Sequence, residues 1–532
     1  MVILKNSLKP RLVNVLRLVW LIVIAWYELG TFYHHVSNCP WPDGVLLASG
    51  TSSHAPTHVL LIADPQILDH RSYPDRPPWL MSLSQFIVDL NIRKSWRATR
   101  RLHPDAVAFL GDMMDNGRVD MPDEEYNQYV RRFRSIFAAD EGLPTYYIPG
   151  NHDVGLGDSS PSYRFSEHAL ERYLSNFGPL NQRISIANHT VLLIDAPGLV
   201  DEDRERAAMG MSYVQWSESH PDRTIAFVRS FAEKHAAERI FYHRPLSDAD
   251  PSEGARPILF THVPLFRPDG TSCGPLRERG TIRQGSGLGY QNLLSPQASQ
   301  FLLQSIRPAV IFSGDDHDYC EYVHTLPSTD TKRPSPPASI PEITVKSFSM
   351  AMGIRRPGYQ LLSLIPPSPS STAQTFAHTP CLLPDQLGIY LSVYVPLLVL
   401  TLALLLLSNV WRTCTRHSSP STRTSEWTSL GPDDATEPDY DLPPPSAWRS
   451  KEFPRPGRSC TCTLPLGGRR RKLTFSSASL MAGIVSFLWT GDRTRNEEAR
   501  KRIGTLKGLA FDVRDVAWAP VALFVGIAWW VW

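Results

Sequence analysis

The sequence predicts an α/β fold: a sandwich of two mixed β-sheets flanked by helices, with transmembrane helices added to it. Two observations carry this prediction. Between residues 58 and 365, short apolar runs rich in β-branched residues alternate with stretches of helical periodicity. Two long apolar segments lie on either side of that region. Strands that are apolar throughout are buried on both faces, so helices are expected on each side of the sheets.

The predicted elements follow one another in a regular order. Apolar runs predict strands at residues 58–63, 106–110, 145–148, 190–194, 258–261 and 309–313. Apolar side chains at helical spacing predict helices at residues 79–102 and 124–137. The segments EITVKSFSM and GYQLLSLI, from Glu342 onward, predict a closing pair of strands. This alternation is typical of an α/β domain.

Two segments are apolar enough to cross a bilayer. Residues 387–410 carry no charge and exceed the length that about 30 Å of hydrocarbon requires. Residues 18–35 contain a single charged side chain, Glu28, and follow a basic N-terminus without a convincing cleavage site after them. They are therefore predicted to be an uncleaved signal anchor, with a cleaved signal peptide as the alternative.

Basic residues predict the orientation of these segments. Arg412 and Arg416 directly follow the second segment, and basic residues also precede the first. Positive charge stays on the cytosolic side of a membrane. Residues 1–17 are therefore predicted to be cytosolic and residues 36–384 to be lumenal, with a folded core at 57–365.

The C-terminal part differs in composition. Residues 411–510 are basic and rich in Pro, Ser and Thr, which predicts a mostly disordered cytosolic tail. Residues 516–532 are apolar and end in several tryptophans, but they have only the minimum length for a span. They are predicted to be a third transmembrane helix, with an interfacial anchor as the alternative.

Composition limits the function classes and indicates the compartment. The net charge is only +2, so the chain as a whole has no signature of nucleic-acid binding. The sequon at Asn188 lies in the predicted lumenal part, as N-glycosylation requires. One or two disulfides could form there, although the sequence does not show the pairing, among Cys39, Cys273, Cys320 and Cys381.

Five short polar motifs stand in a fixed order, each after an apolar run. They are ADPQ (63–66), GDMMD (111–115), GNHD (150–153), THVP (261–264) and GDDHD (314–318). Open α/β sheets gather such groups at the carboxyl ends of their strands, so we expect the motifs to meet there. Carboxylates, amide oxygens and imidazoles are ligands of hard and borderline divalent ions. Two adjacent ions would suit in-line attack on a phosphate ester.

The strand-end carboxylates and histidines are the first ligand candidates. An Asp at a strand end is often only a helix cap or turn residue, but five such sites in order favour metal ligands. Asp64 and Asp112 are therefore predicted ligands, and Asp112 is the natural bridge between two ions. His262, His317 and Asp315 are further candidates, with a satisfied core histidine as the alternative for His262.

GNHD is the most specific of the five motifs. Asn151 offers an amide oxygen to a metal. His152 is poorly placed for the same ion because successive side chains diverge, so it is predicted to be a catalytic acid or a clamp on phosphate. Asp153 is predicted to orient the His152 imidazole through a hydrogen bond.

These motifs resemble the calcineurin-like metallophosphoesterase superfamily, whose pattern is D-x-H, G-D-x-x-D, G-N-H-D/E, H and G-H-x-H. The resemblance covers residues 57–365 and departs from the pattern at Gln66 and Asp315, where histidines are expected. A closer resemblance is to the branch that trims glycosylphosphatidylinositol (GPI) anchors, which includes mammalian metallophosphoesterase 1 and the fungal cell-division-control and Ted proteins. ADPQILDHRSYPDRP, HVPLFRPDGTSCG and SGDDHDYCE look like its fungal members.

The resemblance implies the metallophosphoesterase type of sandwich and a ligand set for two divalent ions. Oxygen ligands in place of two imidazoles make the site harder, which favours Mn²⁺ or Mg²⁺ over Zn²⁺. Manganese is usual in the family, so two Mn²⁺ ions are expected. One ion would be held by Asp64, Gln66, Asp112 and His317, and the other by Asp112, Asn151, His262 and Asp315.

The resemblance also implies a function. It predicts a membrane-embedded phosphodiesterase of the endoplasmic reticulum or Golgi that removes ethanolamine phosphate from GPI-anchored proteins or the GPI lipid. Asp316, Asp318 or Glu321 could meet the ethanolamine ammonium. The alternatives are a lumenal phosphoesterase with another substrate (phospholipid, nucleotide or phosphoprotein) and a non-catalytic scaffold with a degenerate metal site.

Overall fold

The structure is a computed structural model that describes the chain with several gaps. The chain divides into two units, Met1–Leu21 with Leu397–Ala522 and Ile22–Pro396 with Leu523–Trp532, and the second holds all five motifs. The described residues are 8–48, 55–156, 167–242, 256–287, 289–326, 337–367, 374–417, 459–466, 469–476 and 505–532.

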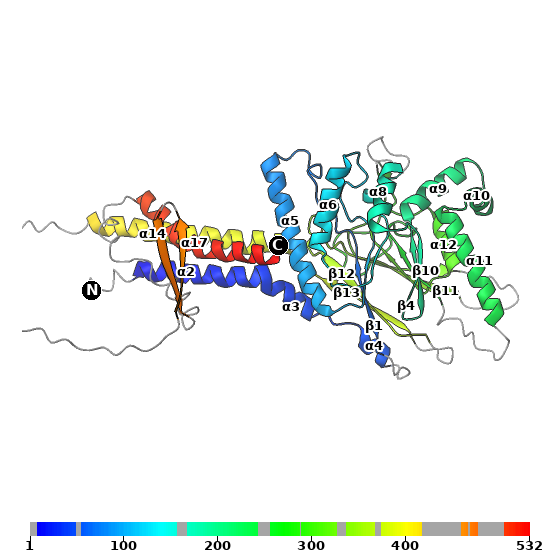
Figure 1. Ribbon diagram of the computed structural model, residues 1–532, viewed down its shortest axis with the longest axis horizontal. Helices are drawn as coiled ribbons and strands as arrows, with labels where there is room; N and C mark the ends of the chain where they lie inside the picture. Colours follow the sequence, from blue (N-terminus) through cyan, green and yellow to red (C-terminus); the bar gives the residue numbers. More distant parts are fainter. Residues whose placement is uncertain are drawn as a thin grey trace, which may run out of the picture. The chain divides into compact units, whose positions relative to one another are not determined.

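Two mixed β-sheets form the centre of the larger unit, as predicted (Figure 1). The five-stranded sheet has the order β13-β12-β1-β2-β3, with bounds β1 Thr57–Ile62, β2 Ala106–Phe109, β3 Thr145–Tyr147, β12 Gly358–Leu364 and β13 Phe376–Leu382. The six-stranded sheet has the order β10-β11-β9-β6-β5-β4, with bounds β4 Gln182–Ile186, β5 His189–Ile194, β6 Ile258–Thr261, β9 Val310–Ser313, β10 Cys320–Leu326 and β11 Ala338–Thr344. A short pair, β7 (Ser286–Gly287) and β8 (Tyr290–Gln291), lies outside both sheets.

Alternation along β1 shows how the sandwich is packed. Leu60 and Ile62 belong to a core cluster shared with α5 (Pro78–Thr99) and α6 (Asp123–Ile136). Val59 and Leu61 point the other way, into a cluster shared with β5, β6 and β9 of the second sheet. Successive strand side chains face opposite sides, so one apolar run can serve both layers.

Helices cover the outer face of each sheet, as the continuous apolar strands predicted (Figure 1). The five-stranded sheet is covered by α5, α6 and α8 (Glu167–Phe177). The six-stranded sheet is covered by α9 (Ala196–Ala208), α10 (Tyr213–Ser219), α11 (Thr224–Tyr242) and α12 (Pro296–Ile306).

The predicted closing pair of strands is wrong. β11 and β12 both exist, but they lie in different sheets. β11 pairs in parallel with β9, whereas β12 pairs antiparallel with β1. Both strands are apolar enough to be buried, and burial alone does not specify which neighbour a strand chooses. β13 pairs with β12 but lies beyond residue 365, the predicted end of the core. The predicted core therefore omitted one strand of the five-stranded sheet.

Two helices among the described residues are long and apolar enough to cross a membrane, Arg11–Ser37 and Gln386–Trp411. They correspond to the two segments that the sequence predicted as spans. The first comprises α2 (Leu8–Ala25), the π-helical turn Trp26–Gly30 and α3 (Thr31–Ser37), and the second comprises α13 (Gln386–Ile389), the π-helical turn Tyr390–Tyr394 and most of α14 (Val395–His417).

The C-terminal region holds more regular structure than the prediction allowed. Helix α17 spans Thr505–Val531, so it begins before the predicted third span and is not one of the two candidates above. Within residues 411–510, strands β14 (Ser459–Leu466) and β15 (Arg469–Ser476) form an antiparallel hairpin. Most of the predicted disordered tail lies outside the described residues.

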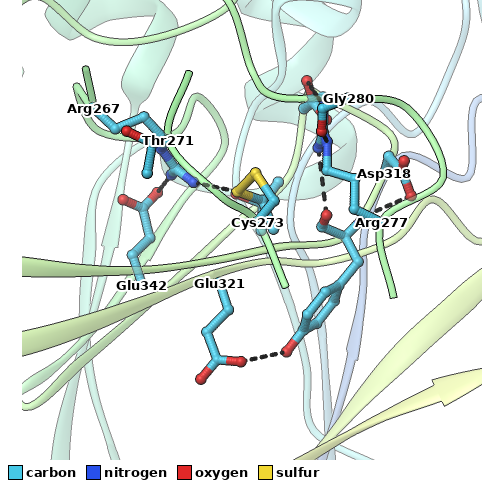
Figure 2. Close-up of a disulfide and its surroundings, with 12 residues drawn as sticks. Arg267, Thr271, Cys273, Arg277, Gly280, Asp318, Glu321 and Glu342 are labelled. Atoms are coloured by element: carbon cyan, nitrogen blue, oxygen red, sulfur yellow. Dashed lines mark hydrogen bonds and ion pairs between the residues drawn. A yellow bond between two sulfur atoms is a disulfide. The ribbon is translucent and has the colours of Figure 1, made fainter. Parts of the chain in front are cut away.

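Two disulfides join the four cysteines of the predicted lumenal region. Cys39 pairs with Cys381 on β13, across a sequence separation of 342 residues. Cys273 pairs with Cys320, which ties the connection between β6 and α12 to the start of β10 (Figure 2). Disulfides persist in oxidising compartments, so this part of the chain has the covalent chemistry of a secreted or lumenal domain.

The Cys39–Cys381 disulfide makes a testable contribution to stability. Because it closes a very long loop, replacing both cysteines by Ser should lower the free energy of unfolding by about 2–5 kcal/mol. Denaturant unfolding of the full chain in detergent, followed by tryptophan fluorescence, measures the change. Cys414→Ser is the control and should leave the transition in place; equal transitions for all variants would contradict the prediction.

Candidate metal centre

Three of the predicted ligands form a tight buried group. One ligand atom each of Asp64, Asp112 and His262 lie within 4.8 Å of one another. Asp64 and Asp112 follow β1 and β2 of one sheet, and His262 follows β6 of the other. The group therefore lies between the sheets at the carboxyl ends of their parallel strands, where the sequence predicted that the motifs would meet.

His262 presents one ring nitrogen to this group. Its Nδ1 lies 2.7 Å from the Leu110 carbonyl oxygen, to which it donates. Its Nε2 then faces oxygen atoms of Asn151 at 3.1 Å, Asp112 at 3.3 Å and Asp315 at 3.6 Å. Four groups from four different motifs converge on one point, and they are the four that were predicted for one ion.

Asp112 lies at the centre of the cluster. Its Oδ1 accepts the backbone N–H of His152 at 2.9 Å, and its Oδ2 accepts a hydrogen bond from Gln66 Nε2 at 2.7 Å. Gln66 thus meets the cluster through its amide nitrogen, whereas the predicted ligand atom was its oxygen. In this arrangement Gln66 holds the Asp112 carboxylate in place.

Asp64 has an oxygen atom that the protein does not satisfy. Its Oδ1 accepts the backbone N–H of Asp315 at 3.1 Å. Its Oδ2 is buried and has no hydrogen-bond partner among the described residues. An unpaired buried carboxylate oxygen is costly unless a cation meets it. The donor set therefore fits a divalent cation.

The charges of the cluster lead to the same conclusion. Burial raises the pKa of Asp64 well above its usual value and raises the pKa of Asp315 to about 7. Burial alone would lower the pKa of His262, but the carboxylates of Asp112, Asp315 and Asp64 raise it well above its usual value. Protons thus neutralise the metal-free cluster, and cations can take their place.

His317 lies close to the same cluster. It is within electrostatic range of Asp112, His152 and His262. Burial lowers its pKa to about 4, so its imidazole is neutral at physiological pH. A neutral imidazole is the form that binds metal ions.

The backbone at the ligands has an unusual conformation. Left-handed backbone is uncommon for residues other than glycine, and it concentrates at functional sites. Five of the seven predicted ligands have positive φ: Asp64 (47°), Gln66 (32°), Asp112 (55°), Asp315 (67°) and His317 (66°). The ADPQ, GDMMD and GDDHD motifs thus turn sharply as their strands end, which directs their ligands into the space between the sheets.

Two motif glycines allow the turns to approach each other closely. A Cβ on Gly150 would lie 2.0 Å from Asp112 Oδ1, and a Cβ on Gly111 would lie 2.3 Å from His262 Nδ1. Neither space can hold even a methyl group. The glycines of GNHD and GDMMD are therefore required by the packing of the ligands themselves.

The prediction that Asp153 orients His152 is wrong. The Asp153 carboxylate instead accepts backbone N–H groups, from Asp112 at 2.8 Å, Gly150 at 2.9 Å and Met114 at 3.3 Å. Its side chain ties the GDMMD turn to the GNHD turn. Successive side chains point in different directions, so Asp153 cannot reach the imidazole of its neighbour His152. For the same reason His152 was not expected to bind the same ion as Asn151.

His152 is oriented by a residue that the sequence reading did not assign. Its Nδ1 lies 2.5 Å from the main-chain oxygen of Asp115 and 3.6 Å from the Asp115 carboxylate. The carbonyl can only accept, so Nδ1 carries the hydrogen and Nε2 remains for the substrate. The sequence shows Asp115 as the last residue of the GDMMD motif, but it gives no indication that the main-chain oxygen of this residue contacts His152.

A further main-chain contact holds Asn151. Its Nδ2 donates to the Gly289 carbonyl oxygen at 2.7 Å, which leaves its Oδ1 facing His262. Arg118 Nη1 donates to the carbonyl oxygens of Asn151 at 2.9 Å and Gly289 at 3.3 Å. The connection between β6 and α12 thereby reaches the metal centre, and the Cys273–Cys320 disulfide fastens the same connection.

Two of the acids predicted to meet an ammonium group are already paired. Arg277 forms an ion pair with Asp316. Lys346 Nζ lies 2.8 Å from Asp318, which also accepts the backbone N–H of Glu278 at 2.7 Å. Their assignment to an ammonium is therefore wrong; Glu321, the third candidate, is exposed and accepts from the Tyr319 hydroxyl at 3.4 Å.

Asn188 lies away from these groups, in the turn between β4 and β5. It is exposed and has a φ of 62°. Asn tolerates the left-handed region in such hairpin turns. Its position leaves the side chain accessible for the predicted glycosylation.

Comparisons with known proteins identify relatives of this chain. Residues 57–319 match the family described as Calcineurin-like phosphoesterase. The chain is 32% identical over 390 residues to Cell division control protein 1 of Saccharomyces cerevisiae, which covers 70% of each protein. It is 26% identical over 363 residues to Metallophosphoesterase 1 of Gallus gallus, covering 65% of this chain and 80% of that one.

A solved structure also aligns with the chain. It is a dimetal phosphatase from Danio rerio, with 14% identity and a TM-score of 0.29, covering 58% of this chain and 96% of that one.

Gly150→Ala tests the close packing of the ligand turns. The added methyl group would overlap Asp112, so the variant should lose bound metal and hydrolytic activity. Metal content after dialysis and turnover of a soluble nitrophenyl phosphodiester measure both. Gly44→Ala is the matched control, because a Cβ there meets nothing within 4 Å. Unchanged metal content in Gly150→Ala would contradict the packing argument.

Metal affinity should depend on pH. Burial raises the pKa of Asp315 to about 7 in the metal-free protein, so a proton competes with the ion below that pH. Because the Asp315 carboxylate binds metal only when it is deprotonated, the binding form is lost as pH falls through this pKa. The Mn²⁺ affinity measured by calorimetry should therefore be higher at pH 8 than at pH 6, about one unit to either side of the pKa. An affinity that does not change with pH would refute this.

Proposed function

This chain belongs to the calcineurin-like phosphoesterase family, and on that premise we propose that it removes ethanolamine phosphate from the mannose core of GPI anchors. It is a metal-dependent phosphoric ester hydrolase by family and by its candidate metal site. The observation that carries the proposal is the buried group of Asp64, Asp112 and His262, with one carboxylate oxygen left unpaired.

We assign the ligands as the family resemblance implies. Asp112 would be shared by two ions. Its central position, with both carboxylate oxygens inside the cluster, supports that role. Oxygen donors outnumber imidazoles in the set, which favours Mn²⁺. The first ion would be held by Asp64, Gln66, Asp112 and His317, and the second by Asp112, Asn151, His262 and Asp315. As a ligand Gln66 would present its amide oxygen in place of the nitrogen that donates to Asp112.

The chain's own residues have defined tasks in the reaction. Divalent ions at this site supply an activated water and neutralise charge on the phosphate. His152 is partly exposed, and its Nδ1–H is held by the Asp115 carbonyl. The neutral ring then has an unprotonated Nε2, which must first gain a proton; as an imidazolium His152 would donate that Nε2 proton to the leaving alkoxide. Asp153 holds the two ligand turns together and does not take part in proton transfer.

Several features support a lumenal membrane setting for the substrate. Two helices are long enough to cross a membrane, and both disulfides lie in the region between them or beside their ends. The exposed sequon at Asn188 lies in the same region. We therefore propose that the catalytic domain faces the lumen of the endoplasmic reticulum or Golgi. An enzyme anchored there would share a surface with a GPI lipid or a GPI-anchored protein.

Asp112→Asn tests the reaction and the substrate together. The variant should fold but lose Mn²⁺-dependent release of ethanolamine phosphate from purified GPI glycans, measured by mass analysis. Cells that carry only this variant should accumulate GPI glycans with an additional ethanolamine phosphate. If the wild-type protein hydrolyses a soluble phosphodiester but leaves GPI glycans intact, the metal site is right and the substrate is wrong.

His152→Ala tests the acid separately from the metal. Loss of a general acid typically lowers kcat by about 10²–10⁴-fold, and the bound metal should be unchanged because His152 is not a proposed ligand. His168→Ala, an exposed histidine on α8, is the matched control. Full activity in His152→Ala would remove this residue from the mechanism.

A further inference from the structure

Helix α5 contacts the candidate spanning helices along its C-terminal half. Lys94 Nζ lies 2.5 Å from Glu28 Oε2, and both side chains are buried. Just beyond the helix, the Arg101 guanidinium lies 4.2 Å from the centre of the Tyr33 ring. Glu28 and Tyr33 belong to the first candidate span, Arg11–Ser37. All of these residues lie in the larger unit.

The second candidate span meets the same point. Glu28 Oε1 accepts hydrogen bonds from the Tyr394 hydroxyl at 2.8 Å and from Gln386 Nε2 at 3.3 Å. Gln386 is the first residue of the span Gln386–Trp411, at the end nearest the catalytic sheets. A buried charge in such a helix needs partners, and Glu28 finds them on the second candidate span and on α5.

The end of α17 packs against α5 as well, and Figure 1 shows α5 passing beside the C-terminus. The Arg93 guanidinium lies 4.6 Å from the Trp532 ring centre, and the Arg97 guanidinium lies 5.1 Å from that of Trp530. The rings of Phe86 and Trp532 stack with centres 5.7 Å apart. Exposed tryptophans typically gather at the level of the lipid headgroups. The tryptophans beside this face of α5 are thus of the kind that marks a membrane boundary.

The same face continues into the N-terminal half of α5, where its apolar side chains are exposed. Trp79, Leu83 and Phe86 are 69%, 45% and 37% exposed. These side chains are four and three residues apart, and the same spacing leads on through Leu90 to Arg97. They therefore lie on the same side of α5 as the residues that contact the tryptophans at the end of α17. Large exposed apolar side chains in a row mark an interaction surface.

We propose that the N-terminal half of α5 is a membrane-surface helix, in which Trp79, Leu83 and Phe86 insert into the headgroup boundary of the bilayer that the two spans cross. The occupant is lipid because the stripe continues directly from the ends of the spans and from the exposed tryptophans. Interfacial helices sink their apolar face roughly 5–10 Å into this boundary.

This contact would hold the catalytic domain against one membrane surface. The spans hold the domain at their ends, and an interfacial helix would add a second line of contact that fixes which side of the domain faces the lipid. The metal centre would then be kept close to phosphate esters carried on that leaflet. The inference concerns the lipid contact alone and does not depend on GPI being the substrate.

Depth-dependent quenching tests the proposal on the full chain. Cys414, Cys460 and Cys462 are replaced by Ser, and Leu83→Cys is labelled with a nitrobenzoxadiazole fluorophore. The protein is reconstituted into phosphatidylcholine vesicles with or without lipids that carry a nitroxide near the headgroup end of the acyl chain. We expect a clear loss of fluorescence in the nitroxide vesicles.

Leu174→Cys on α8 is the matched control, because Leu174 is 42% exposed, close to Leu83, but lies outside the stripe. Its fluorescence should not change. Trp79→Cys provides a second position on the stripe, and turnover of a soluble phosphodiester verifies that each labelled protein is folded. No quenching at positions 83 and 79, or equal quenching at position 174, would overturn the proposal.

Discussion

The burial of several carboxylates in one small space is the constraint on which this structure depends. Asp64, Asp112 and Asp315 approach the single imidazole ring of His262 between two apolar sheets. Such a group is unstable without compensating positive charge, because charges are strongly disfavoured in a nonpolar interior. Protons can supply the compensation, but divalent cations do so and also create a reactive centre. Compensating positive charge is thus an electrostatic requirement of the fold, and divalent cations would meet it and supply the chemistry as well.

Backbone geometry provides the remaining support. Main-chain carbonyls of Leu110, Asp115 and Gly289 orient His262, His152 and Asn151, and the Asp153 carboxylate collects main-chain N–H groups from two turns. Every such contact requires the turns to be placed to within a few tenths of an ångström. Apolar strands on both sides, glycines without side chains and a disulfide across the β6–α12 connection together provide that rigidity.

The layered α/β architecture could be predicted from the sequence because each strand is a short apolar run that is followed by a polar motif. Strand pairing could not be predicted. β11 and β12 look alike as sequences, yet one joins β9 and the other joins β1. The sequence analysis missed β4, β10 and β13. These strands lie at sheet edges and are partly exposed, so they contain polar residues and do not stand out as apolar runs.

The sequence by itself determined which residue types surround the metal centre, because ligand chemistry is visible in side chains and motif order. It also identified the two apolar helices and the four cysteines among which disulfides could form, although not their pairing. Only the tertiary structure decided that Asp153 holds backbone and Asp115 holds His152, and that Arg277 and Lys346 neutralise Asp316 and Asp318. These contacts join residues that are distant in sequence or use main-chain atoms, which every residue possesses, so no pattern of residue types could reveal them.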